Sequence, residues 1–204
     1  MISRLVVGLG VVVSLVCGGQ AFAVTIPATD LDTWLTGGSI GGPLTDDFDS
    51  FSPPGTIGSI ENEVFYDGVY TYTHEVTPSV NNNILFSTGI PIAGFTGIAG
   101  YSFSQSGAAG GAGSGLDFDI MEVDGFLAWV SNIPDIGWDS GESITFFYTS
   151  NNRPGMGQYN LAGFQSGTAQ SFAPVPEPGS IALLGSGLVG LYAAVRRRRQ
   201  QRQS

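Results

Sequence analysis

Residues 116–131 read LDFDIMEVDGFLAWVS, and this stretch indicates the class of fold more clearly than any other. From residue 116 to residue 120, apolar and acidic side chains alternate, which is the period of a strand with one buried face. Asp124 and Gly125 then provide a favourable two-residue hairpin turn. Residues 126–131 are mostly apolar again, so the stretch predicts two antiparallel strands joined by a tight turn.

Pairing across this turn assigns the side chains of the hairpin to two faces. Ile120 is expected opposite Trp129, and Glu122 opposite Leu127, because the pairing register follows from the two-residue turn. One face is apolar on both strands, and we predict that it belongs to the core. Its members are Leu116, Phe118, Ile120, Leu127 and Trp129.

Asp117 and Asp119 are expected on the opposite, solvent-facing side of the first strand. Two carboxylates at positions i and i+2 of one strand are candidate calcium ligands, and they are also a candidate pair for a glycosidase. The simpler interpretation, which we favour, is that they solvate the outer face of an antiparallel sheet.

The rest of the chain between residues 24 and 174 repeats these signals of short strands and turns. Asp67 and Gly68 separate two segments rich in β-branched and aromatic residues, which predicts a second hairpin. Residues 143–150 are apolar on both faces, as expected for a central strand that is buried on both sides. Because helical periodicity is absent, we predict an all-β fold. The expected architecture is an antiparallel β-sandwich, for which a jelly-roll strand order is one option.

Two further features could carry chemistry but have simpler explanations. His74 is the only histidine, and the sequence spacing identifies no partner for it, so we interpret it as a packing or surface residue. Residues 107–115 contain only Gly, Ala and Ser, and we interpret them as a flexible surface loop. They lack the Lys and Ser/Thr that complete a phosphate-binding P-loop.

The charge of the chain is strongly acidic. Of the 17 acidic residues, all but Glu177 lie within residues 24–173, where Arg153 is the one basic residue. This part of the chain therefore carries a net charge of about −15, compared with −10 for the whole chain. Such a surface repels nucleic acid and anionic lipid headgroups, and it suits divalent cations or a neutral polysaccharide. Solubility outside the cell is the simpler explanation, and we favour it.

The N-terminal residues 1–23 have the composition of a secretory signal peptide, with a positive residue before an apolar core. Ala21 and Ala23 supply the small side chains that signal peptidase requires, so the predicted mature chain begins at Val24. Cys17, the single cysteine, is then removed with the signal. A disulfide, a thiolate nucleophile and a cysteine-based metal site are thereby excluded from the mature protein.

The C-terminal residues 174–204 have three parts with different physical roles. Three prolines keep the first part extended and exposed. Residues 179–195 are apolar, and as a helix they would span about 25 Å, slightly less than a hydrocarbon core of about 30 Å. The last part is a cluster of Arg196, Arg197, Arg198 and Arg199. Because these arginines resist transfer across the membrane, we predict a single marginal transmembrane helix that leaves residues 24–173 outside.

This order of parts resembles the PEP-CTERM sorting signal of Gram-negative bacteria, whose motif is carried here by Val175, Pro176, Glu177 and Pro178. The resemblance implies export and a transient stay in the inner membrane. It also implies recognition and cleavage near Pro-Glu-Pro by a membrane-embedded exosortase, followed by residence at the cell surface or outside the cell. An association with exopolysaccharide or biofilm is a further implication. A plain single-span anchor is the alternative.

Two functional classes remain open for residues 24–173, which we call the body. The first is a non-enzymatic surface protein that associates with extracellular polysaccharide. Its expected partners during export are the export machinery, signal peptidase and exosortase, and no nucleic acid is expected. The second is an extracellular carbohydrate-active enzyme, or a calcium-dependent carbohydrate-binding module. Trp34 and Trp138 could stack on sugar rings or belong to the core. We favour the first class, because the sequence contains no recognisable catalytic motif.

Overall fold

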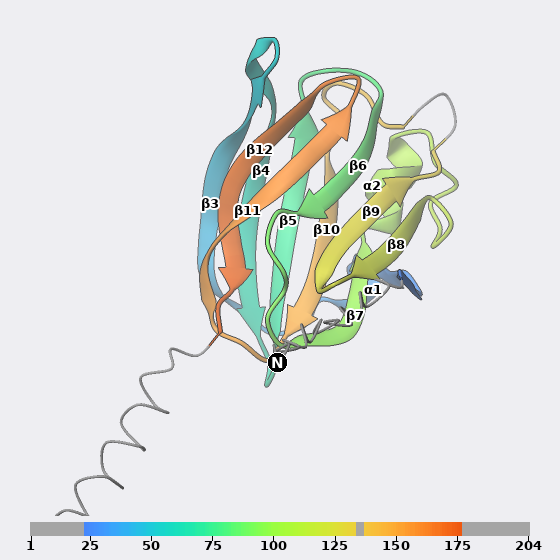
Figure 1. The fold of residues 1–204 in the computed structure, drawn as a ribbon. Coiled ribbons are helices and arrows are strands. Elements are labelled where there is room, and N and C mark those ends of the chain that lie inside the picture. Colours follow the sequence, from blue (N-terminus) through green and yellow to red (C-terminus); the bar gives the residue numbers. More distant parts are fainter. Residues whose placement is uncertain (1–22, 134–136, 177–204) are drawn as a thin grey trace, which may run out of the picture.

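The computed structural model describes residues 23–133 and 137–176, which fold into a strongly curled β-sheet with two short helices (Figure 1). The strands are β1 (Val24–Ile26), β2 (Thr29–Asp30), β3 (Gly38–Phe51), β4 (Pro54–Tyr66), β5 (Tyr70–Pro78), β6 (Asn83–Thr88), β7 (Phe95–Tyr101), β8 (Phe118–Val123), β9 (Phe126–Ser131), β10 (Ile144–Ser150), β11 (Pro154–Gly163) and β12 (Ser166–Pro174). The helices are α1 (Leu31–Trp34) and α2 (Phe103–Ala108). The predicted all-β class is confirmed.

The strand order shows how the sheet curls. It runs β1-β8-β9-β6-β11-β12-β3-β4-β5-β10-β7-β2, and every pairing is antiparallel except that of β2 with β7. The first and last strands in this order, β1 and β2, are consecutive in the chain. Residues 24–30 therefore bridge the two ends of the sheet. The sequence predicts a sandwich of two sheets, whereas the structure has one continuous sheet that curls upon itself.

The hairpin of residues 116–131 forms as predicted at its turn. Ile120 pairs with Trp129 and Glu122 with Leu127. The prediction that Leu116 belongs to the core is wrong, because Leu116 is 79% exposed and lies before β8 begins at Phe118. The alternating pattern extends into residues 116 and 117, but these two residues belong to the preceding loop.

The second hairpin and the central strand also form. Tyr66 pairs with Tyr70, so the turn around Asp67 and Gly68 contains three residues and not two. Strand β10 lies between β5 and β7, which confirms the prediction of a central strand. Its outward-facing Phe147 is covered by Trp34 of α1, with ring centroids 6.3 Å apart. This cover explains why the strand is apolar on both faces.

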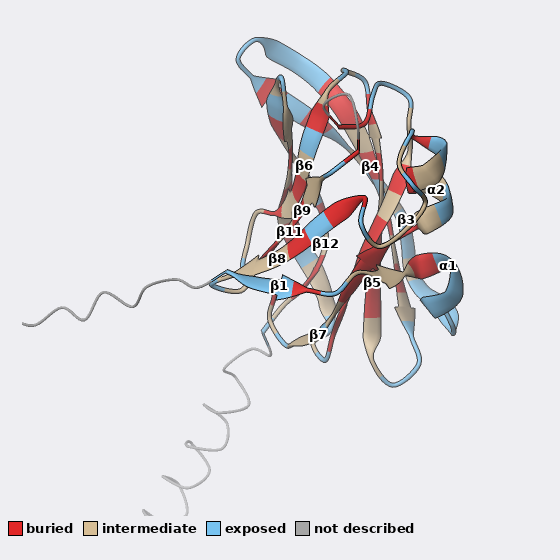
Figure 2. Cartoon of the chain, turned by 90° about the vertical axis from the view of Figure 1, so that its right-hand side faces the viewer, coloured by how far each residue is buried: buried red, intermediate tan, exposed pale blue. Residues whose placement is uncertain are grey.

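The core lies between the two halves of the curled sheet, where Figure 2 shows most of the buried residues. Phe86 on β6 stacks on Phe146 on β10, with ring centroids 4.8 Å apart. Trp129 on β9 reaches across to β7 and donates its indole N–H to the Gly100 carbonyl at 3.1 Å. Aromatic pairs of this kind add about 0.5–1.5 kcal/mol each to the stabilisation from buried area. They hold together strands that are not neighbours in the sheet.

His74 lies at the centre of this core and is fully buried, so the packing interpretation is confirmed. Asn62 Nδ2 donates a hydrogen bond to His74 Nδ1 at 2.8 Å, and the Tyr159 ring centroid is 4.3 Å away. In the described part of the chain, Nε2 has no hydrogen-bond partner. Burial lowers the pKa of the His74 imidazole to about 3, so the ring is neutral at physiological pH.

The predicted membrane segments fall largely outside the described residues. Ala23 and residues 174–176 are described. Ala21 and the rest of the predicted signal peptide, Glu177 and Pro178 of the motif, the predicted C-terminal helix and the arginine cluster lie outside the described residues. Val175, the first motif residue, donates its backbone N–H to the Arg153 carbonyl at 3.0 Å. Within residues 23–133 and 137–176, neither helix has the length and apolar character that a membrane span requires.

Candidate functional site

Asp117 is buried, with 4% of its surface exposed, so the prediction that it faces solvent is wrong. Its carboxylate accepts hydrogen bonds from the Ser106 hydroxyl and from the backbone N–H groups of Ala112, Gly113 and Ser114, at 2.8–3.2 Å. Burial raises the pKa of this carboxyl, but the four hydrogen bonds outweigh burial and hold the pKa below its ordinary value. Asp117 therefore remains charged and organises the loop before β8.

The glycine-rich residues 107–115 are held by several contacts, which differs from the predicted flexible loop. A Cβ atom on Gly111 would lie 2.7 Å from the Asp117 carboxyl carbon, so a side chain does not fit there. Tyr101 adds a second fixed point, because its hydroxyl donates to the Ser114 carbonyl at 2.6 Å. The same hydroxyl accepts hydrogen bonds from two backbone N–H groups, those of Asp117 and Phe118. The glycines allow the chain to pass this close to a buried carboxylate.

Asp119 is exposed on β8, as predicted, so the two aspartates do not act as a pair on one face. Both oxygens of Asp117 accept hydrogen bonds from backbone N–H groups of its own loop. Across the described ranges, no group of three or more His, Cys, Asp or Glu residues is arranged to hold a metal ion. The arrangement around Asp117 is that of a structural carboxylate.

The two candidate sugar-stacking tryptophans have different positions. Trp138 is fully buried and packs edge-on against Phe118, with ring centroids 5.4 Å apart, so it belongs to the core. Trp34 is 37% exposed, but one face of its ring stacks on Phe147. Trp34 therefore forms part of the outer surface where α1 meets the sheet.

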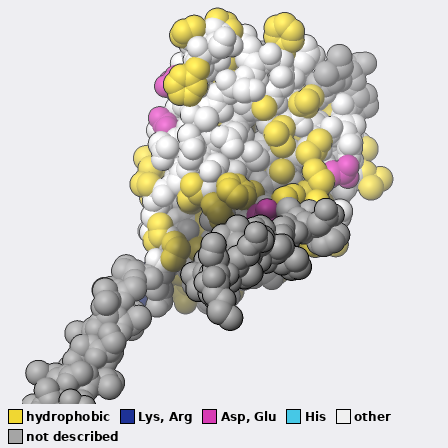
Figure 3. All heavy atoms as spheres, in the orientation of Figure 1, with side chains coloured by type: hydrophobic (Ala, Val, Ile, Leu, Met, Phe, Trp, Pro, Cys, Tyr) yellow, Lys and Arg dark blue, Asp and Glu magenta, His cyan; other side chains and the backbone are white. Residues whose placement is uncertain are grey.

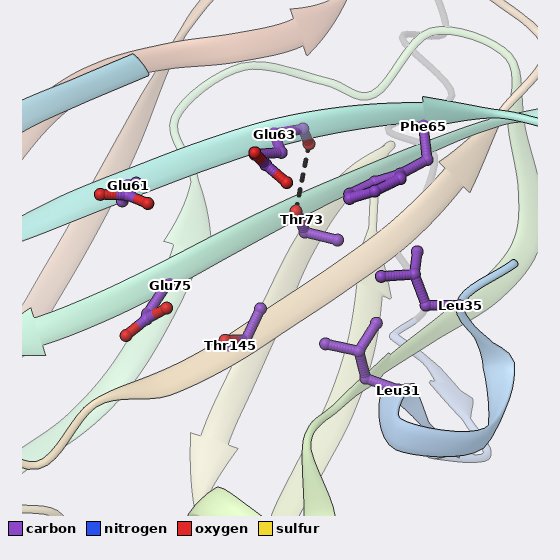
Figure 4. A pocket seen from close by; sticks show the side chains of 8 residues that line it. All are labelled: Leu31, Leu35, Glu61, Glu63, Phe65, Thr73, Glu75 and Thr145. Atoms are coloured by element: carbon purple, nitrogen blue, oxygen red, sulfur yellow. Dashed lines mark hydrogen bonds between the residues drawn. The ribbon is translucent and has the colours of Figure 1, made fainter. Parts of the chain in front are cut away.

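An open cleft of about 210 Å³ lies on this outer surface, between α1 and strands β4, β5 and β10 (Figure 4). We call it the outer-face cleft. One wall is apolar, and the floor carries carboxylates and hydroxyl groups. The residues that line it are Leu31, Leu35, Glu61, Glu63, Phe65, Thr73, Glu75 and Thr145.

Strand alternation explains why these side chains face outward. On β4, Ile60, Asn62 and Val64 are fully buried in the core, so the residues between them project from the other face. Glu61 pairs directly with Glu75 on β5, and Thr73 donates its hydroxyl to the Glu63 carbonyl at 3.1 Å. The cleft thus has a floor built from three adjacent strands.

Three carboxylates gather in this cleft, two of them paired directly across β4 and β5. In the view of Figure 3, acidic side chains stand singly and apart from one another. In Figure 4, Glu61, Glu63 and Glu75 lie on two neighbouring strands, with Leu31 and Leu35 across from them. None of the three glutamates is buried. The cleft can therefore accept hydrogen bonds at one side and cover an apolar surface at the other.

The outer-face cleft was not predicted from the sequence. The alternation of residues 60–65 indicated that Glu61, Glu63 and Phe65 share a face. Nothing in the sequence indicated that the four-residue helix α1 would lie against the same face. The sequence thus contained a signal for the side of the cleft that β4 forms, but none for the side that α1 forms.

Comparison with known proteins identifies the C-terminal segment. Residues 174–199 match the family model described as the PEP-CTERM protein-sorting motif. No curated protein and no solved structure matches the chain significantly. The match and the fold together define an exported protein with a β-sheet body. More particularly, the chain is a PEP-CTERM sorting domain-containing protein, with an exosortase as its processing partner and the cell surface as its destination.

Proposed function

We propose that the body is a non-enzymatic protein of the extracellular matrix that binds exopolysaccharide in the outer-face cleft. The lining of this cleft carries the proposal. Phe65 offers a ring on which a sugar can pack, and the neighbouring carboxylates and threonine hydroxyls can bond to sugar hydroxyl groups. The sorting motif supports it, because it directs the protein to the surface where such polymers are found.

The exposure of the candidate groups favours binding over catalysis. A glycosidase requires one carboxyl group that burial keeps protonated near neutral pH. Glu61, Glu63 and Glu75 line an open cleft, and none of them is buried. His74 and Asp117 are buried, but each is enclosed by its own part of the fold. These positions support a binding role for the cleft.

Truncation of Phe65 is expected to weaken polysaccharide binding. In a pull-down with exopolysaccharide purified from the native cells, the Phe65→Ala protein should bind about tenfold more weakly than the unaltered protein, because the ring contact is lost. Phe164→Ala is the matched control, since Phe164 is 86% exposed and does not line the cleft. We expect the same result with calcium and with a chelator. Equal losses for both variants would contradict the proposal.

Processing at both ends is expected in protein recovered from its native cells. Intact mass should place the N-terminus at Val24 and the C-terminus near Pro176 to Pro178, because signal peptidase and exosortase each remove one segment. This result would also fit a transient stay in the inner membrane. A mature protein that retains Arg196 to Ser204 would instead indicate a plain membrane anchor, and the exopolysaccharide proposal would lose the support of the sorting motif.

A further inference from the structure

We infer that the outer-face cleft selects a polysaccharide whose sugar rings carry protonated amino groups, in preference to neutral or anionic polymers. The inference rests on the proposed function and adds the chemical class of the ligand. It stands on the juxtaposition of three carboxylates with an apolar wall, in one cleft and without a basic residue among the lining.

The carboxylates in the cleft lack a counter-charge. Glu61 and Glu75 are directly opposite each other across β4 and β5, and like charges in this position are destabilising. Arg153 is the one lysine or arginine within the described ranges, and it is not among the residues that line the cleft. A ligand that brings positive charge would relieve this repulsion, whereas an anionic polymer would increase it.

The apolar wall fits the rest of such a ligand. Leu31, Leu35 and Phe65 lie beside the carboxylates, as Figure 4 shows. A pyranose ring has an apolar C–H face, which can pack on Phe65 while a substituent of the ring reaches a carboxylate. An ammonium group makes charge-assisted hydrogen bonds, which are about twice as strong as those of a neutral hydroxyl. An amino sugar therefore uses both the apolar wall and the acidic floor of the cleft.

The floor of the cleft disfavours an extended basic peptide as the ligand. Strand β4 is paired with β3 and β5, β5 with β4 and β10, and β10 with β5 and β7. None of these strands is a sheet edge, so a peptide cannot add to the floor as a further strand. A ligand can therefore contact only the side chains of the cleft and not the backbone of its strands. A polymer of sugar rings and their substituents can bind in this way.

A pair of oligosaccharides with the same sugar backbone, one with free amines and one with those amines acetylated, tests the inference. Processed protein from the native cells would be titrated calorimetrically with a glucosamine hexamer and with the same hexamer fully N-acetylated. We expect the free-amine form to bind at least tenfold more tightly. The triple variant Glu61→Gln, Glu63→Gln, Glu75→Gln should lose this preference and bind both forms with similar affinity.

A control with the same change of net charge separates the cleft from general electrostatics. Asp49→Asn, Asp119→Asn and Asp124→Asn alter three exposed carboxylates outside the cleft, so this variant should keep the preference. A thermal midpoint for the glutamine variant at or above that of the unaltered protein would show that it folds, since a repulsion has been removed.

The remaining outcomes would overturn the inference. Equal binding of the two hexamers would leave polysaccharide binding in place but exclude selection of the amine. Equal loss of preference in both triple variants would reduce the effect to net charge. Binding of a lysine hexapeptide as tight as that of the amino sugar would favour a basic peptide. If neither hexamer binds and Phe65→Ala has no effect on retention, the proposed function fails as well.

Discussion

Lowering the pH from 7 to 5 is expected to reduce the free energy of unfolding by about 2 kcal/mol through His74 alone. The pKa of this imidazole is about 3 in the folded protein, compared with 6.5 for an unperturbed histidine. Below pH 6.5, the unfolded chain binds a proton that the folded protein does not, so each pH unit costs about 1.4 kcal/mol. Above pH 6.5, the stability is fully present. The loss is about 4 kcal/mol at pH 3 and levels off at about 5 kcal/mol below that pH.

The low pKa has a clear structural cause. His74 is fully buried, and a protonated ring would place a charge beside Asn62 and the aromatic rings of the core. The groups that face it supply no negative charge. Burial raises the pKa of the Tyr148 and Tyr159 hydroxyls, so both remain neutral throughout this pH range. Phe86 completes the surroundings and is apolar.

Other groups with perturbed pKa values do not interfere between pH 5 and pH 7. Hydrogen bonds outweigh burial and hold the pKa values of Asp32 and Asp117 below the ordinary 3.8. Their contribution to stability is present above pH 3.8 and falls only as the pH drops further. The window from pH 5 to pH 7 therefore isolates the effect of His74 from that of these carboxylates.

Urea unfolding at pH 7 and pH 5 measures this effect. His74→Gln is the control, because an amide can still bond to Asn62 but does not titrate. This variant is expected to be less stable at both pH values, with a difference between them of less than about 0.5 kcal/mol. If the variant keeps the full pH dependence of the unaltered protein, other residues must cause it.

The sequence predicted the local pairings of the fold better than its closure. The turn at Asp124 and Gly125 fixed the register of β8 and β9, because both residues adopt the positive φ that a two-residue hairpin needs. The pairing of β1 with β8, and of β2 with β7, joins segments about 70 to 100 residues apart. Such contacts depend on the curl of the whole sheet, which no local pattern encodes.

The candidate sites show the same limit. Alternation placed Asp117 on a solvent-facing side, but the backbone N–H groups of the preceding loop drew this carboxylate inward. The glycines of that loop resembled a flexible linker, since composition does not reveal a buried carboxylate as the partner of the loop. The alternation of residues 60–65 could have placed Glu61 and Phe65 on one face, but it was not used. Helix α1 has four residues and is too short to give a periodic signal.

Replacement of Asp117 by alanine is expected to lower the free energy of unfolding by about 3–4 kcal/mol. The change removes an acceptor that binds Ser106 and three backbone N–H groups of the loop, and it leaves those donors without their partner. Hydrogen bonds to a charged group contribute about 1.5–3 kcal/mol each, and burial of the carboxylate offsets part of their sum. Urea unfolding at pH 7 would measure the loss.

Two comparison variants test whether the carboxylate itself is responsible. Asp119→Ala should change stability by less than about 0.5 kcal/mol, because Asp119 lies on β8 and is exposed. Asp117→Asn should cost about 2 kcal/mol, since an amide keeps one accepting oxygen but turns N–H donors toward the N–H groups of the loop. In both Asp117 variants, amide hydrogen exchange should increase most over residues 111–116, compared with the unaltered protein. If Asp117→Ala matches Asp119→Ala in stability, the glycine-rich loop does not depend on this carboxylate, and its order must come from Tyr101.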